Sequence, residues 1–268
     1  MPSAVYDGAC QDPPTVQTLR YGPHRQHVMD LGLPEDGNPT RPYPVAFVLH
    51  GGFWRARYKR VLMEDLCADL VVRGWAAVNV EYRRVGRLTG GGGGVPQTLD
   101  DVAAALDHLA SVAAPLDLDR VVSVGHSAGG HLALWAAAGG RDRDRARVRC
   151  AGAVGQAALS DLERAAELGL GAGIVRRFCG GGPESVPDQY RRASPAARLP
   201  LGVPQLLVHG ERDDIVPASL SKGYAMAARA GGDDVALVLR PDDGHFEHLD
   251  PASGAWEAVT GWLTRFER

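Results

Sequence analysis

The sequence predicts an α/β protein with a mostly parallel sheet and helices on both of its faces. Short runs of consecutive apolar residues alternate with segments of helical periodicity along nearly the whole chain. Strands that are apolar at every position are typical of strands covered on both faces, and their alternation with helices indicates parallel pairing. No internal repeat and no second composition regime occurs, so we expect one domain over residues 1–268.

The apolar and periodic segments place the expected elements in order. Two short strands surround the turn at 21–23, and buried strands are expected at 45–49, 75–80, 121–124, 151–155, 205–208 and 235–239. Helices are expected at 61–73, 97–111, 128–138, 218–230 and 253–266. The segment 157–200 fits neither pattern, so we expect an irregular insertion there, either a lid with glycine hinges or a static cap.

Composition and charge exclude several classes of protein. The chain has 29 Lys and Arg against 32 Asp and Glu, a net charge of −3, and 45% hydrophobic residues. This composition excludes disorder and shows no electrostatic signal for nucleic acid or an anionic membrane. The N-terminus lacks the parts of a signal peptide, and no apolar run reaches the roughly 20 residues of a membrane span. We therefore expect a cytoplasmic protein without nucleic-acid or membrane partners, for which a homodimer stays an open option.

Glycine and cysteine residues are expected to have no binding role. Five consecutive glycines, Gly90 to Gly94, predict a mobile loop, and a phosphate-binding role is disfavoured because no Lys-Ser/Thr pair follows them. We attribute most of the 34 glycines and the excess of arginine over lysine to genome composition. The four cysteines fall in no disulfide or metal-ligand spacing and are expected mainly as buried thiols. No metal or organic cofactor is expected.

The strongest motif is Gly-x-Ser-x-Gly, formed by Gly125, Ser127 and Gly129. It lies directly after the expected strand at 121–124 and before the helix at 128–138. A serine on a sharp strand-to-helix turn has strained backbone geometry, and its neighbours must be small. The turn presents the hydroxyl at the carboxyl end of the sheet, beside a helix N-terminus that favours negative charge. We predict that Ser127 is a nucleophile, against the alternative of a glycine-rich turn with an incidental serine.

A second motif, His-Gly-Gly-Phe-Trp at 50–54, follows another expected strand. Glycines at this place allow backbone N–H groups to point at a substrate oxygen, as an oxyanion hole requires. The candidate donors are the N–H groups of Gly51, Gly52 and Phe53, with that of Ala128 after the nucleophile. His50 is expected to hold this loop rather than to act as a base.

Candidate acid and base residues follow the last two strands. Asp213 and Asp214 come after the strand at 205–208, and His245 and His248 come after the strand at 235–239. Loops after parallel strands converge at one edge of a sheet, where a carboxylate can orient a histidine. The order Ser, Asp, His matches a hydrolase constellation, although spacing alone leaves both pairs of alternatives open.

At these residues the sequence resembles the α/β-hydrolases, over nearly the whole chain. Within that superfamily it is similar to the small esterases that include arylformamidases (kynurenine formamidase-like enzymes) and acetyl esterase/lipase-type proteins. The stretches that carry the resemblance are Tyr-Gly-Pro with Asp-Leu-Gly-Leu-Pro within 21–34, the motif at 50–54, and Gly-His-Ser-Ala-Gly-Gly-His-Leu-Ala at 125–133. The resemblance implies an α/β-hydrolase fold with a small cap or lid insertion.

The resemblance also implies roles for individual residues. Asp213 lies four residues after the histidine of His-Gly-x-x-Asp-x-x-Val-Pro, the position of the triad acid, and His245 of Gly-His-Phe corresponds to the base. Phe53 departs from the family's His-Gly-Gly-Gly loop, which leaves the donors open among the three residues after His50.

The implied activity is hydrolysis of a carboxylic ester or an N-formyl aryl amide through an acyl-enzyme on Ser127. The substrate would be a small molecule, and we expect Trp54, Tyr58 and His126 to line its pocket. Alternatively, Trp54 and Tyr58 only pack the loop.

Two other functions compete with this prediction. A prolyl-oligopeptidase-like peptidase is disfavoured because such domains usually carry a large propeller or extra acidic residues for a peptide amine. A non-catalytic α/β-hydrolase scaffold that acts as a binding module is disfavoured because binding does not need a complete set of Ser127, Asp213 and His245.

Overall fold

The computed structural model describes residues 16–35, 41–86, 88–140 and 146–267. The predictions about the N-terminal segment and about Cys10 therefore fall outside the described residues. Within the described ranges, no helix is long and apolar enough to cross a membrane. Of the described cysteines, Cys150 and Cys179 are buried free thiols and Cys67 is a partly exposed one.

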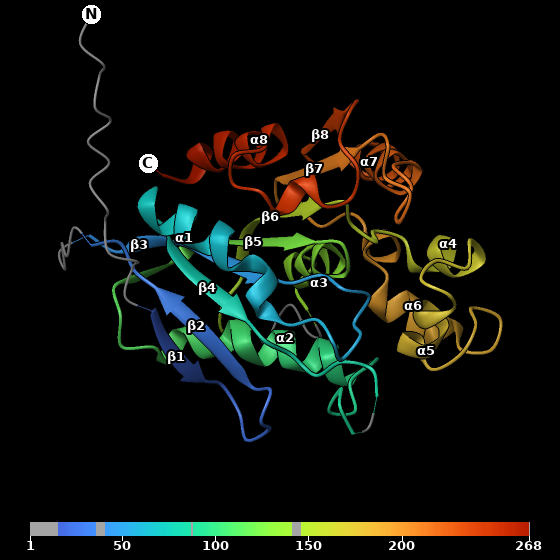
Figure 1. Cartoon of the computed structure of the whole chain (residues 1–268), viewed down its shortest axis with the longest axis horizontal. Coiled ribbons are helices and arrows are strands. Elements are labelled where there is room, and N and C mark those ends of the chain that lie inside the picture. Colours follow the sequence, from blue (N-terminus) through green and yellow to red (C-terminus); the bar gives the residue numbers. More distant parts are fainter. Residues whose placement is uncertain (1–15, 36–40, 87, 141–145, 268) are drawn as a thin grey trace, which may run out of the picture.

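Eight strands form one sheet in the described part of the chain (Figure 1). The spatial order is β1-β2-β4-β3-β5-β6-β7-β8, with the first two strands antiparallel and all pairings from β4 to β8 parallel. The strands are β1 Val16–Arg20, β2 Val28–Gly32, β3 Tyr43–Leu49, β4 Ala76–Val80, β5 Leu116–His126, β6 Cys150–Gln156, β7 Gln205–Gly210 and β8 Val235–Arg240. The predicted mostly parallel sheet is confirmed.

Helices cover both faces of the sheet, because its central strands are apolar on both sides. One face packs against α1 and α8 through a core that includes Val48, Val124 and Trp256. The other face packs against α2, α3 and α7 through a larger core that includes Phe47 and Leu132. These helices are α1 Glu64–Val72, α2 Gln97–His108, α3 Ala128–Ala137, α7 Ser219–Ala230 and α8 Gly254–Leu263. Short 3-10 turns extend several of them, at Arg60–Met63, Leu109–Ser111 and Thr264–Phe266.

The segment 157–200 is helical, which corrects the expectation of an irregular insertion. It contains α4 Leu162–Glu167, α5 Ile174–Cys179, α6 Pro187–Ala193 and the 3-10 turn Pro195–Arg198. Each helix has only six or seven residues, too few for helical periodicity to show in the sequence. Gly173 and Gly180, both left-handed, bound α5. These helices gather beyond the carboxyl end of β5 and form what we call the cap (Figure 1).

The glycine run at 90–94 also differs from its prediction. The backbone N–H of Arg84 donates to Gly90 O at 2.6 Å, and the N–H of Gly93 donates to Arg84 O at 2.8 Å. A Cβ at Gly90 would lie 2.3 Å from Val85 O, and one at Gly93 would lie 2.3 Å from Arg83 O. The interpretation of these two glycines as a product of composition is therefore wrong, because the close approach of two backbone segments excludes any side chain there.

Candidate active site

Ser127 occupies a strained turn between β5 and α3. Its φ and ψ are 58° and −119°, in a region that residues other than glycine rarely adopt. A Cβ at Gly125 would lie 2.2 Å from Gly129 O, and one at Gly129 would lie 2.0 Å from Leu49 O. The two glycines of the motif are thus required by the packing of the turn, as a nucleophile elbow requires.

The backbone of Ser127 is fixed, whereas its hydroxyl has no hydrogen-bond partner within the described ranges. The Ser127 N–H donates to Gln156 O at 2.8 Å, and Ser127 O accepts from the His131 N–H at 3.1 Å. The side chain is buried, and its Oγ does not bond His245 in this structure. In hydrolases without substrate the bond between nucleophile and base is often long and tightens only on binding.

Asp213 and His245 are joined directly, with His245 Nδ1 donating to Asp213 Oδ2 at 2.7 Å. The other carboxylate oxygen accepts the backbone N–H groups of Ile215 at 2.9 Å and Val216 at 2.8 Å. Burial alone would raise the pKa of Asp213, but hydrogen bonds from His209, from His245 and from the Val216 N–H hold this pKa below its usual value. The carboxylate is therefore ionised and fixes the orientation of the imidazole.

The two alternative residues lie in different surroundings. Asp214 is exposed to solvent. His248 is fully buried, and neither of its ring nitrogens has a hydrogen-bond partner within the described part of the chain. Burial lowers the pKa of His248 to about 4, so this histidine is neutral at physiological pH. Only the pair Asp213 and His245 has the geometry of an acid that orients a base.

His209 is a site residue that the sequence did not assign. Its Nε2 donates to Val216 O at 2.8 Å and lies 3.3 Å from Asp213 Oδ2, while its Nδ1 lies 2.7 Å from Ser221 Oγ. It thus supports the loop that carries Asp213. Its place as the first residue of His-Gly-x-x-Asp was the available signal.

The loop at 50–54 lies directly against the nucleophile turn. A Cβ at Gly51 would lie 3.1 Å from Ser127 Cβ and 2.8 Å from His126 O. Gly52 has a φ of 106°, and Phe53 follows with a φ of 52°, so this non-glycine residue also adopts the left-handed region. The N–H groups of Gly52 and Phe53 have no acceptor among the residues described and are free for a ligand. The departure from the glycine-rich family pattern therefore retains the backbone shape of a donor loop.

His50 lies beneath this loop, fully buried. Its Nδ1 lies 2.8 Å from Gly51 O, and its Nε2 lies 3.1 Å from the carboxylate of Glu81, which also pairs with Arg84. The ring stacks on Tyr82 with centroids 4.3 Å apart, and the Tyr82 hydroxyl donates to His50 O at 2.6 Å. These contacts hold the start of the loop, the task predicted for His50.

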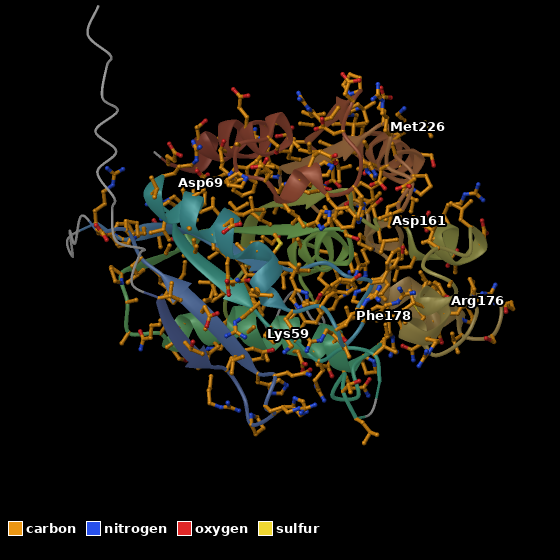
Figure 2. The ribbon with its side chains drawn as sticks, viewed as in Figure 1. Lys59, Asp69, Asp161, Arg176, Phe178 and Met226 are labelled. Carbon is orange, nitrogen blue, oxygen red and sulfur yellow. The ribbon has the colours of Figure 1, made fainter. Side chains whose placement is uncertain are left out.

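The cap packs onto the other side of the loop. Arg55 donates to Gly171 O at 2.6 Å, and a Cβ at Gly171 would lie 2.9 Å from the Phe53 ring. Trp54, fully buried, stacks on Phe178 of α5 with ring centroids 4.0 Å apart (Figure 2). The cap therefore fixes residues that follow the expected oxyanion donors.

The three residues predicted to line a substrate pocket have the following places. Trp54 lies between the loop and the cap with no exposed surface. Tyr58 is half-buried, and its ring packs against Gly52, where a Cβ would lie 2.4 Å away. His126 is 2% exposed and donates from Nε2 to His245 O at 2.8 Å. All three lie next to the catalytic loops, and all contact protein groups.

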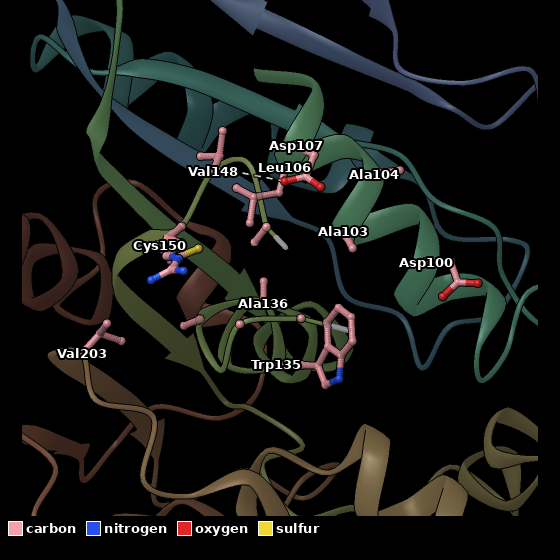
Figure 3. A pocket seen from close by; sticks show the side chains of 15 residues that line it. Asp100, Ala103, Ala104, Leu106, Asp107, Trp135, Ala136, Val148, Cys150 and Val203 are labelled. Atoms are coloured by element: carbon pink, nitrogen blue, oxygen red, sulfur yellow. Dashed lines mark hydrogen bonds between the residues drawn. The ribbon is translucent and has the colours of Figure 1, made fainter. Parts of the chain in front are cut away.

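A cavity of about 630 Å³ lies elsewhere, between α2, α3 and the start of β6 (Figure 3). Trp135, Asp107 and Cys150 are among its lining residues. Cys150 begins β6, whereas Ser127 follows the carboxyl end of the neighbouring β5. The cavity thus opens at the amino-terminal edge of the sheet and contains none of the predicted site residues.

Comparison with known proteins agrees with this site. A family model described as BD-FAE matches residues 29–227. Esterase LipQ of Mycobacterium tuberculosis (strain ATCC 25618 / H37Rv) is 29% identical over 245 residues, which cover 85% of this chain and 56% of LipQ. A probable dipeptidyl-peptidase 5 of Emericella nidulans is 25% identical over 248 residues, covering 87% of this chain and 33% of that protein. The chain thus spans about half or less of the length of these curated relatives.

Solved structures show the same fold. A truncated carbohydrate esterase from gut microbiota superposes with a TM-score of 0.79 and 19% identity, covering 96% of this chain and 98% of that one. The butyrate-bound esterase Est2 of Thermogutta terrifontis superposes with a TM-score of 0.74 and 19% identity, covering 95% of each chain. The predicted α/β-hydrolase fold is confirmed.

Proposed function

The chain belongs to the BD-FAE family, and from that premise we propose that it hydrolyses carboxylic esters through an acyl-enzyme on Ser127. The observation that carries the proposal is the 2.7 Å bond between His245 Nδ1 and Asp213, on loops that lie against the strained Ser127 turn. A binding scaffold would need neither the strained turn nor the ionised carboxylate behind the histidine. The esterases among its relatives and structural neighbours support the same activity.

The chemistry follows from the positions of the groups. His245 Nε2 takes the proton of Ser127 Oγ as the oxygen attacks the ester carbonyl, and Asp213 keeps the imidazole in the Nδ1–H form and stabilises its cation. The N–H groups of Ala128 and of Gly52 or Phe53 hold the oxyanion, and removing one such donor typically costs about 3 kcal/mol. His245 then protonates the leaving alcohol, and water attacks the acyl-enzyme with the same base.

We place the substrate among esters with a short acyl group. The cap packs directly on Phe53 and Trp54, which leaves apolar and aromatic surfaces around the donor loop. Relatives named as esterases, and a structural neighbour with bound butyrate, support an ester of this size. The finer alternative is an N-formyl aryl amide, which the same nucleophile, base and donors could cleave.

A second candidate activity is peptidase action, because a probable dipeptidyl-peptidase is among the relatives. Such an enzyme releases a dipeptide from a free amino terminus and therefore needs a carboxylate for the substrate amine. An aminoacyl-anilide substrate would show this activity directly.

The test combines a panel of substrates with an active-site label. We expect hydrolysis of p-nitrophenyl acetate and butyrate to exceed that of longer esters, of N-formylkynurenine and of aminoacyl-anilides. A fluorophosphonate probe should label the protein at Ser127, and Ser127→Ala should lose both the label and at least about 1,000-fold in kcat. Full esterase activity in Ser127→Ala would contradict the proposal, and absent labelling of the wild-type protein would favour a binding scaffold.

A further inference from the structure

His126 is a buried titratable residue that the reaction scheme does not use. It ends β5 and directly precedes Ser127, and its Nε2 lies 2.8 Å from the main-chain oxygen of His245. A carbonyl oxygen only accepts hydrogen bonds, so Nε2 carries a proton and donates it. The residue before the nucleophile thus holds the main chain of the residue that serves as base.

We propose that His126 is a positioning residue that fixes the distance between base and nucleophile, an inference that rests on the proposed function. Ser127 is tied to β6 by its N–H bond to Gln156 O at 2.8 Å, and the His245 ring is tied to Asp213. The bond from His126 to His245 O joins these two fixed groups. With it, neither the main chain nor the ring of His245 is free to move away from Ser127.

Gln156 supplies a second fixed point for the same loop. It ends β6 and pairs in register with His126 of β5. Its Nε2 donates to His248 O at 3.0 Å, three residues after the oxygen that His126 holds. Two side chains at adjacent strand ends therefore grip two carbonyls of the loop that carries the base.

The charge state of His126 suits this task. Burial lowers the pKa of His126 well below its usual value, and the neighbouring His245 and His248 lower it further, against smaller opposing effects from the bond to His245 O and from Asp213. His126 is therefore neutral when His245 becomes an imidazolium. A neutral donor anchors the loop without repelling the charge that forms on His245.

Removing the donor while keeping the ring tests the proposal. In His126→Phe we expect kcat for p-nitrophenyl acetate, normalised to fluorophosphonate-titrated sites, to fall about 10- to 100-fold, the cost of a base displaced by a fraction of an ångström. KM should stay within about twofold, because the substrate contacts do not change. His126→Gln, whose amide can donate, should recover at least about a third of the lost activity on a logarithmic scale.

A matched control is His131→Phe. His131 is also a fully buried histidine, and its Nε2 donates to Ala193 O at 2.9 Å, in the cap rather than in the base loop. We expect this change to lower the melting temperature while kcat per titrated site stays within about threefold of the wild type. The contrast separates loss of a buried hydrogen bond in general from loss of this one.

The outcomes distinguish the proposal from its premise. An inactive wild-type protein would overturn the proposed function itself. An active wild type with unchanged kcat in His126→Phe, whatever its stability, would overturn the positioning role, and so would a loss that His126→Gln does not recover. If His126→Phe fails to fold, Gln156→Leu decides, because a reduced kcat at unchanged KM supports the two-point grip and a wild-type kcat contradicts it.

Discussion

The nucleophile turn and the cap above it both contain glycines with clear structural positions, but the reasons differ. In the turn, a Cβ at Gly129 would lie 2.0 Å from Leu49 O, so backbone packs against backbone with no space for a methyl group. In the cap, Gly173 and Gly180 have left-handed φ values of 80° and 86°, yet a Cβ at either would meet nothing within 4 Å. The turn is constrained by contact, whereas the cap is constrained only by local backbone conformation.

This difference follows from what each region does. The turn must hold a hydroxyl, a base and N–H donors within a fraction of an ångström, which requires a tightly packed frame. The cap needs only to cover the loop at 50–54, which it does through side chains such as Phe178 on Trp54. We therefore expect changes in the turn region to affect catalysis or folding strongly, and changes in the cap to have graded effects.

The largest effect should come from Asp213→Asn. The amide would hold the wrong tautomer of His245, and kcat for p-nitrophenyl acetate should fall about 10,000-fold with the fold intact. The control is Asp214→Asn at the exposed neighbouring position, for which we expect a change below about twofold. Equal losses in the two variants would contradict the assignment of the acid.

Gly129→Ala should have the next largest effect, on stability. Because its Cβ would press on Leu49 O, the free energy of unfolding in urea should fall by more than about 4 kcal/mol, or the protein should not fold at all. Gly180→Ala in the cap should cost only about 1–2 kcal/mol, from backbone strain at a positive φ. A cap variant as damaging as the turn variant would break the contrast between the two regions.

The pH dependence of stability tests the contact between α3 and the cap. Burial lowers the pKa of His131 to about 4, so between pH 6.5 and pH 4 the unfolded chain binds the extra proton. The stabilising contribution of this neutral histidine is complete above its unfolded pKa and is lost as the pH falls. Relative to His131→Phe, the wild type should lose about 2 kcal/mol between pH 7 and pH 5 in urea titrations. A constant difference over that range would show that His131 is not held neutral.

The smallest effect should come from Arg55→Ala. This change removes the 2.6 Å bond to Gly171 O and a cation–π contact in which the guanidinium lies 5.7 Å from the Phe53 centroid. We expect a loss of about 1 kcal/mol in the free energy of unfolding. Arg57→Ala, whose guanidinium lies over the Tyr58 ring on the exposed side, should cost less than about 0.5 kcal/mol.

The sequence predicted the parts of the molecule in which chemistry or backbone geometry permits few residue types. The sheet and its main helices follow from apolar runs such as 45–49 and from the periodicity at 97–111. Ser127 could be chosen because its turn requires small neighbours on both sides. Spacing could not choose between Asp213 and Asp214, since their difference in burial depends on loop packing that the resemblance alone anticipated.

Other features depend on contacts between distant segments. The cap helices are too short for a periodic signal, and Gly90 and Gly93 are required only because the chain passes close to residues 83–85. The side chain of His126 was predicted to face the substrate, but its direction is set by a carbonyl 119 residues later in the chain. Such partners become visible only when both segments are placed in space.

The central claim is that Ser127 forms a covalent acyl intermediate. The most direct measurement is to mix the protein with p-nitrophenyl acetate, quench it with acid within the first turnovers, and locate the adduct by peptide mass spectrometry. We predict one acetyl group on Ser127, more of it in a variant with a slowed base, and none in Ser127→Ala. Turnover of the ester with no acetyl group on Ser127, or with the group on another residue, would contradict the account.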